Sequence, residues 1–233
     1  SPKVLFGLST KSMTADFATA NAELASALMH PNFDNTDQIQ QIVTQTRFLL
    51  EQNLLHGGHM LAMSAASSGF SRAEALSHQW HGLEGIRFIR ALHQHLLEDE
   101  QNLFQLTDEL QKLHGQLIES PLTLQVIGGH KLRDNLEAVL QTNWNPPTTT
   151  TSCAPQVEPN SMPVRQLWTT PSHVNFCAMS FSTVTYGHAD AAALTVLGYF
   201  LHNGYLNTAL RELGGAYGVG ASQESSLAAF RFF

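Results

Sequence analysis

An arginine, two glycines and a tyrosine near the end of the chain have types and a spacing suited to peptide chemistry. In the segment 205–221, YLNTALRELGGAYGVGA, Arg211 precedes Gly214 and Gly215, and Tyr217 follows them. A helix that ends at the glycine pair would carry Arg211 in its last turn and would let the reversed chain present Tyr217 at the start of a strand. A guanidinium and a phenol both donate hydrogen bonds. These donors suit a peptide carbonyl and the oxyanion that develops when this carbonyl is attacked.

The residues around Tyr217 are small. They would let a substrate backbone approach closely, or pair with the edge of the strand. The same segment also fits a simpler structure, in which the glycines end a helix, the Arg211 side chain reaches solvent and Tyr217 fills the core. Spacing alone leaves both interpretations open.

The twelve histidines include three close pairs that could contribute to a metal site: His56 with His59, His78 with His81, and His93 with His95. A zinc site needs three or four converging ligands, usually with a carboxylate or a thiolate among them. No recognisable partner completes any of the pairs. We therefore predict that they do not bind zinc.

Two stretches begin like the H-x-x-E-H motif of inverted zinc peptidases. His95 opens the first, but Asp99 stands where the second histidine is required, and Gly85 takes that place after His81. We predict no metal ligands in this chain, and we interpret the histidines as surface residues or hydrogen-bonded core residues. A histidine-rich metal-binding protein remains a weaker alternative, with the candidate ligands His56, His59, His78 and His81.

Nucleophilic catalysis has no support in the sequence. There is no G-x-S-x-G elbow, and the serine pairs at 67–68 and 225–226 are typical of turns. Cys177 lies in a predicted strand, where burial would make its thiol inert. The stretch 128–131, GGHK, is too short and wrongly spaced for a phosphate loop. We predict no catalytic residue in this chain.

Charge and composition exclude several classes of partner. The net charge is −7, and the 12 lysines and arginines form no cluster, so nucleic acid is not an expected partner. No apolar run approaches the roughly 20 residues that cross a bilayer, and the first residues lack the layout of a signal peptide, so no membrane association is expected. With 43% apolar residues, a soluble globular protein is expected. Cys153 and Cys177 are too few for a disulfide framework and favour a reducing compartment, the cytoplasm or an organelle matrix.

A stretch rich in proline and threonine divides the chain. Residues 145–163 hold five of the nine prolines and a run of four threonines, with Glu158 as their only charge. That composition favours extended and poorly packed backbone. We interpret it as a linker between a mostly helical domain, 1–144, and a second domain, 164–233.

Apolar residues recur at helical spacing through most of the first domain. Capping boxes, Asn35 with Gln38 and Ser71 with Glu74, mark the starts of two helices. Residues 60–66 fit either a short strand or a helical extension. The expected helices are 13–30, 35–50, 71–80, 86–92, 103–117 and 132–140, and a strand is expected at 122–127.

In the second domain, β-branched and aromatic residues predict a strand at 174–186. Helices are expected at 191–201 and 205–213, with an interruption at Asn203-Gly204, and a hairpin is expected from 217–222 and 227–233. Both domains therefore mix strands and helices. The predicted fold class is α+β, with helices packed on a mostly antiparallel sheet.

The string R-E-L-G-G-A-Y-G, residues 211–218, resembles the R-x-x-G-G-A-Y-G element in the C-terminal half of the pitrilysin/insulinase-type (inverzincin) zinc peptidases. The presequence-protease branch of that family is the most similar. Stretches at 6–12, 58–70, 75–82 and 230–233 also resemble that branch. The similarity runs from near residue 6 to the end of the chain and is weakest in 145–163.

The resemblance implies an enzyme of two halves, each made of two related α+β domains. This chain would be the later part of the third domain and the earlier part of the fourth. The family's H-x-x-E-H motif lies in the N-terminal half of the polypeptide and is absent here, so the zinc ligands are implied to lie outside this chain. The resemblance gives Arg211 and Tyr217 the role of binding the peptide substrate, supported by Gly214 and Gly215.

The implied function is to supply the substrate-binding and chamber-wall part of a zinc-dependent oligopeptidase that degrades unfolded peptides. By itself the chain is then expected to be inactive. The alternative is a non-catalytic, peptidase-like binding or assembly subunit. An intact upstream H-x-x-E-H with a distal glutamate would support the enzyme, and a degenerate one would support the subunit.

Overall fold

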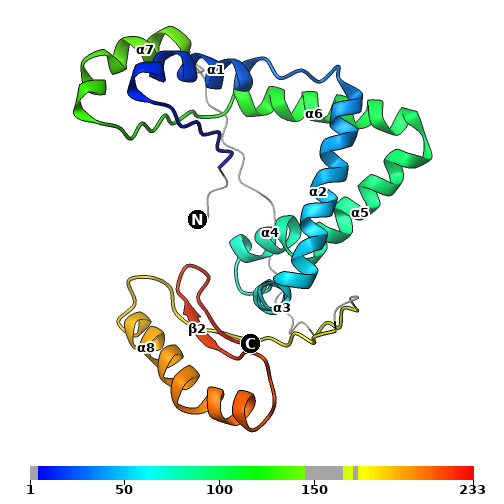
Figure 1. The fold of residues 1–233 in the computed structure, drawn as a ribbon, viewed down its shortest axis with the longest axis vertical. Coiled ribbons are helices and arrows are strands. Elements are labelled where there is room, and N and C mark those ends of the chain that lie inside the picture. Colours follow the sequence, from blue (N-terminus) through cyan, green and yellow to red (C-terminus); the bar gives the residue numbers. More distant parts are fainter. Residues whose placement is uncertain (1–4, 145–164, 170–172) are drawn as a thin grey trace. The chain divides into compact units, whose positions relative to one another are not determined.

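A computed structural model describes residues 5–144, 165–169 and 173–233 (Figure 1). Its described residues form two compact units: one contains 5–41 and 96–144, and the other contains 42–95 together with the described residues after 164. The predicted linker, 145–163, and Cys153 lie outside the described residues. The division into 1–144 and 164–233 thus stays a prediction, while the second unit takes residues from both sides of the linker.

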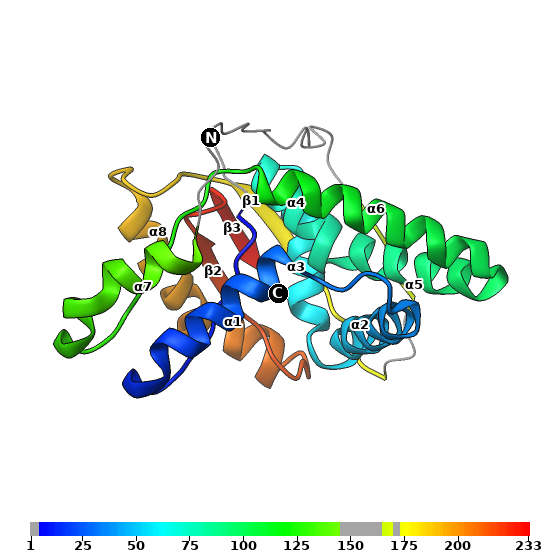
Figure 2. The same ribbon diagram turned by 90° about the horizontal axis from the view of Figure 1, so that it is seen from above.

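The first unit is helical, and α1 and α7 lie side by side in it (Figure 2). Asn21 of α1 joins them: its side-chain nitrogen donates to the Val139 carbonyl at 3.4 Å, and its oxygen accepts from the buried Trp144 indole at 2.9 Å. The His114 ring also bonds to the Leu28 carbonyl, at 2.7 Å. The helical elements that lie at least partly in this unit are η1 (Thr14–Asp16), α1 (Phe17–Met29), α6 (Glu100–Ile118), η2 (His130–Asn135) and α7 (Leu136–Asn143).

The second unit contains an apolar cluster built from three helices. Trp168 packs against this cluster, and the Arg87 guanidinium lies 5.2 Å from the centre of the indole. The buried members of the cluster are Leu54, Leu61, Ala65, Leu83 and Ile86. They come from α2 (Thr36–His56), α3 (Gly58–Ser67) and α5 (Leu83–Glu98), and α4 (Arg72–His81) lies between α3 and α5 in the sequence.

Both predicted capping boxes are confirmed. The Gln38 amide donates to Asn35 Oδ1 at 3.1 Å before α2, and the Glu74 amide donates to Ser71 Oγ at 3.1 Å before α4. Residues 60–66 are helical, as part of α3, so the strand alternative is wrong. Asp99, which spoils the H-x-x-E-H pattern after His95, caps α6 by accepting from the Gln101 amide at 2.9 Å.

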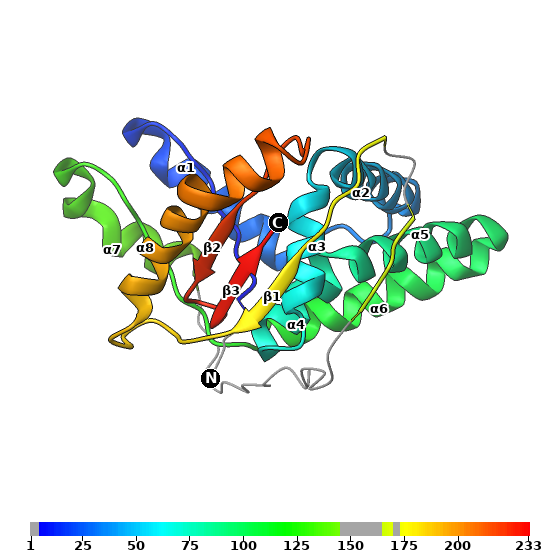
Figure 3. The ribbon, with the colours of Figure 1, turned by 90° about the horizontal axis from the view of Figure 1, so that it is seen from below.

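A three-stranded antiparallel sheet completes the second unit (Figure 3). Its strands are β1 (Met179–Ser182), β2 (Ala221–Glu224) and β3 (Ala229–Phe232), in the order β1-β3-β2. Helix α3 contacts β1 and β3, and α8 (Ala191–Leu201) contacts β2. The α+β class with an antiparallel sheet and the predicted hairpin are therefore confirmed.

Two predicted strands differ from the structure. No strand forms at 122–127, because no described segment pairs with it, and an apolar run without a ladder partner has no sheet to join. Of the predicted strand 174–186, only the four residues of β1 pair with β3. Asn203-Gly204 does not interrupt the helix, which instead widens into the π-helix η3 (His202–Glu212).

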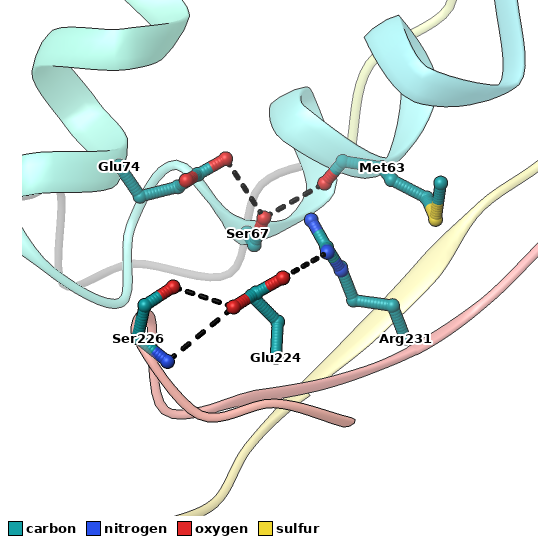
Figure 4. Close-up of polar contacts among 6 residues, drawn as sticks. All are labelled: Met63, Ser67, Glu74, Glu224, Ser226 and Arg231. Carbon is teal, nitrogen blue, oxygen red and sulfur yellow. Dashed lines mark hydrogen bonds and ion pairs between the residues drawn. The ribbon is translucent and has the colours of Figure 1, made fainter. Parts of the chain in front are cut away.

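Polar side chains are buried around the end of α3 and on the sheet (Figure 4). The fully buried Ser67 hydroxyl lies 2.8 Å from the Met63 carbonyl oxygen and 3.2 Å from Glu74 Oε1. On the hairpin, the Arg231 guanidinium lies 3.4 Å from Glu224 Oε2. Buried polar groups are costly unless they are paired, so these contacts fix the packing geometry more than they add stability.

His78 on α4 gives the second unit a defined pH dependence. Its side chain is 5% exposed, and neither ring nitrogen has a hydrogen-bond partner among the described residues. Burial lowers the pKa of His78 below its usual 6.5, and the nearby Glu84 charge opposes this only in part. Between those two pKa values the unfolded chain binds a proton that the folded chain rejects, so the stability contribution is complete above pH 6.5 and is lost as the pH falls below it.

We expect His78→Gln to reduce the fall in unfolding free energy between about pH 7.5 and about pH 5.5, because glutamine does not titrate. Urea unfolding at the two pH values measures this change. His56→Gln is the matched control, since His56 is exposed and should leave the pH dependence as it is. An identical pH dependence in the wild type and in His78→Gln would refute the assignment.

No helix in the described ranges is both long enough and apolar enough to cross a lipid bilayer.

Candidate functional site

Arg211 lies near the end of η3, which continues α8 without a break. Hydrogen bonds here span five residues, as in the bond from the Leu213 amide to the Thr208 carbonyl at 3.0 Å. π-helical geometry is rare, and where it occurs it is frequent at functional sites. The sequence signal for it was the Asn203-Gly204 pair, which was expected to break the helix.

The glycine pair ends this helix, as predicted. Gly215 has a φ of 76°, in the left-handed region that favours glycine, and its amide donates to the Arg211 carbonyl at 3.2 Å. The Ala216 amide closes a wider ring by donating to the Leu210 carbonyl at 2.9 Å. These bonds satisfy carbonyls of the last helical turn, and the chain reverses at the glycines.

Gly214 is required by space and not by its backbone conformation. A Cβ at this position would lie 2.7 Å from the Leu210 carbonyl oxygen and 3.2 Å from that of Ala209. Both obstacles are backbone atoms of the helix itself, so they cannot rotate away as a side chain can. The two adjacent glycines therefore meet two separate needs of one tight helix end.

Arg211 and Tyr217 are both exposed on either side of this turn, and the Tyr217 side chain is 87% accessible. The alternative in which Tyr217 fills the core is therefore wrong. Arg211 does reach solvent, as the simple helix end predicts. Neither side chain makes a hydrogen bond, ion pair or ring contact with another residue in the described part of the chain. Their donors are thus free for an incoming acceptor, and their joint role in binding a substrate stays a prediction.

The edge of β2 near this turn is not open along its whole length. Gly220 and Phe233 exchange two backbone hydrogen bonds, so the next carbonyl, that of Ala221, points away from β3. It points toward α8, because a Cβ at Gly198 would lie 2.9 Å from this oxygen. A peptide therefore cannot pair with β2 at Ala221, which limits the strand-edge pairing expected from the sequence.

The candidate histidine ligands lie in four different environments. His56 is exposed, His59 lies between two phenylalanine rings, His78 is buried, and His81 has its ring edge-on to Trp80. Across the described ranges, no three or more histidine, cysteine, aspartate or glutamate side chains are grouped so as to hold a metal ion. These residues do not fit a zinc site, so no step through a metal is assigned to them.

Two models of one peptidase family match most of the chain. The first, described as a peptidase M16 (subfamily C) associated region, matches residues 1–92, and the second, described as "Peptidase M16 inactive domain", matches residues 124–233. The chain belongs to the peptidase M16 family. The Arg211–Tyr217 turn of this M16 chain lies within the inactive-domain match.

Curated relatives of this M16 chain are named mitochondrial presequence proteases. The protein from Yarrowia lipolytica is 26% identical over 88% of this chain, that from Emericella nidulans 29% over 75%, and that from Saccharomyces cerevisiae 22% over 100%. The alignments cover 21%, 17% and 24% of those proteins, so the chain spans about a fifth of the length of the relatives it matches. The presequence-protease resemblance is therefore confirmed.

Proposed function

We propose that this M16 chain is the substrate-binding and chamber-wall portion of a zinc-dependent oligopeptidase that degrades unfolded peptides. The observation that carries the proposal is the Arg211–Tyr217 turn. It presents a guanidinium and a phenol, both exposed and without partners in the described chain, at the two ends of a glycine turn that leaves little freedom. Each group can donate a hydrogen bond to a peptide carbonyl oxygen.

In this role Arg211 would hold a carbonyl of the peptide by a charge-assisted hydrogen bond. Tyr217 would donate to the oxygen on which negative charge develops, an interaction that strengthens as the carbonyl is attacked. Gly214 and Gly215 would hold the two donors in place. Zinc would be held by residues of the N-terminal half of the same polypeptide, and there it would supply the activation of water.

The compartment is proposed from the same comparison. The matched relatives are named mitochondrial, and we propose that the full polypeptide works in an organelle matrix. The sequence expectation of unpaired thiols agrees with such a reducing compartment.

A peptide assay with the isolated 233-residue chain tests the division of labour. We expect the chain to bind a fluorescent unfolded peptide, with weaker binding by Arg211→Ala, and to show no turnover of a fluorogenic peptide with or without added zinc. Arg165→Ala is the control for the loss of a positive charge, because it lies outside the turn. Zinc-dependent turnover that a chelator abolishes would show that the chain carries its own metal site and would overturn the proposal.

The alternative is a non-catalytic, peptidase-like binding or assembly subunit. The name of the second matching model, an inactive domain, is the observation in its favour. The upstream sequence separates the two functions: an intact H-x-x-E-H with a distal glutamate supports the peptidase, and a degenerate motif supports the subunit.

A further inference from the structure

Tyr217 has no side-chain partner in the described chain, so its position depends on the backbone on either side of it. On the N-terminal side the backbone is fixed by the helix end at Gly215. On the C-terminal side the backbone is next fixed at Gly220, which is buried three residues further on. Whatever holds Gly220 therefore also determines where the tyrosine hydroxyl lies.

Gly220 is held by Phe233 in two ways. Its amide donates to the Phe233 carbonyl at 2.7 Å, and the Phe233 amide donates back to the Gly220 carbonyl at 3.0 Å. The Phe233 ring also covers Gly220 so closely that a Cβ there would overlap it. Only a glycine allows this ring to lie on the backbone.

The Phe233 ring is in turn held by α3. His59, in the first turn of α3, lies with its ring centre 5.8 Å from that of Phe233, at an interplanar angle of 31°. The ring centre of Phe176 also lies 6.5 Å from that of His59, at an angle of 40°. Both distances are in the range of attractive ring pairs. Gly58 lets the Phe176 ring approach the helix, since a Cβ at Gly58 would overlap that ring.

We infer that His59 is a positioning residue for Tyr217, acting through the ring of Phe233 and the backbone of Gly220. The inference rests on the substrate-binding role proposed for Tyr217. It connects two regions that are far apart in sequence, since His59 lies in the first family match, 1–92, and Tyr217 in the inactive-domain match, 124–233. His59 itself touches neither substrate nor metal in this role.

The test is a double-mutant cycle in the full-length peptidase, with kcat and KM measured separately for an unfolded peptide. His59→Leu removes the flat ring but keeps an apolar side chain, and His59→Phe keeps a ring. We expect His59→Leu to lower kcat about tenfold with little change in KM, because a small displacement of a donor acts mainly on the transition state. His59→Phe should retain most of the activity, and His56→Leu, at an exposed histidine three residues earlier, is the matched control.

The second arm of the cycle repeats His59→Leu in a Tyr217→Phe background. If His59 acts through the tyrosine hydroxyl, its replacement costs nothing further once that hydroxyl is gone. An equal loss in both backgrounds, or no loss in either, would overturn the inference while leaving the role of Tyr217 intact. A Tyr217→Phe enzyme with full activity would instead overturn the proposed function and this inference with it.

If His59→Leu does not yield folded protein, the same cycle is run with His59→Gln, which keeps a polar side chain at the half-buried position. Amide hydrogen exchange at Gly220 supplies a readout that is independent of activity. We expect faster exchange at Gly220 in the ring-removing variant and wild-type exchange in His59→Phe. Unchanged exchange at Gly220 in the ring-removing variant would show that the ring does not hold this backbone and would overturn the inference.

Discussion

Tyr217→Phe in the full-length peptidase is expected to lower kcat/KM for an unfolded peptide by about 10²-fold or more, which corresponds to about 2–4 kcal/mol of lost transition-state binding. The change removes a single hydroxyl from a side chain that is 87% exposed and has no partner in the described chain. The folded state loses no contact, so the unfolding free energy should stay within about 0.5 kcal/mol of the wild type. A loss of activity without a loss of stability is the signature of a group that acts on the substrate.

Arg211→Ala should have a similar effect on kcat/KM, with a larger share of it in KM, because a guanidinium binds the ground-state carbonyl as well as the transition state. The matched control is Tyr205→Phe, which removes the hydroxyl of another exposed tyrosine on η3. Its activity should equal that of the wild type. Equal activity of the wild type, Tyr217→Phe and Arg211→Ala would end the substrate-binding assignment.

Gly214→Ala is expected to destabilise the second unit by about 1–3 kcal/mol, the usual cost of placing a methyl group where there is no room for it. The new Cβ would lie 2.7 Å from the Leu210 carbonyl oxygen, so the helix end must open or shift. Because the glycine turn also connects Arg211 to Tyr217, we expect peptide turnover in the full-length protein to fall together with stability. Urea unfolding of the 233-residue chain and peptide turnover by the full-length protein measure the two effects.

Gly218→Ala is the matched control for this prediction. A Cβ at Gly218 would meet nothing within 4 Å, and its backbone conformation is one that other residues adopt. Its unfolding free energy should stay within about 0.5 kcal/mol of the wild type. If Gly214→Ala were as stable and as active as Gly218→Ala, the tight helix end would not be what holds the two donors.

The helical part of this fold could be predicted because its determinants are local. The Asn35/Gln38 and Ser71/Glu74 boxes bond their own backbone within one turn, and the structure contains both bonds. The strand predicted at 122–127 failed because a strand exists only with a partner, and pairing is not encoded in the segment itself. Asn203-Gly204 was misjudged because residues that weaken a helix do not break it when the flanking turns continue.

The candidate site shows the same division. The string 211–218 is enough to indicate the Arg211 and Tyr217 pair and the helix end between them, because glycine alone tolerates the conformation of Gly215 and the crowding at Gly214. Sequence also accounts for the near-miss at Asp99, whose carboxylate caps α6 and cannot replace the second histidine of the motif.

Only the tertiary structure decided that Tyr217 faces solvent, that α8 covers the β2 carbonyl at Ala221, and that His59 packs on Phe233. Each of these depends on how segments distant in the sequence pack together, and no local spacing specifies such contacts. The sequence by itself determined which residues can donate hydrogen bonds to a peptide and where the chain turns between them. The packing of α3 and α8 around the sheet determined which of those residues are free to do so.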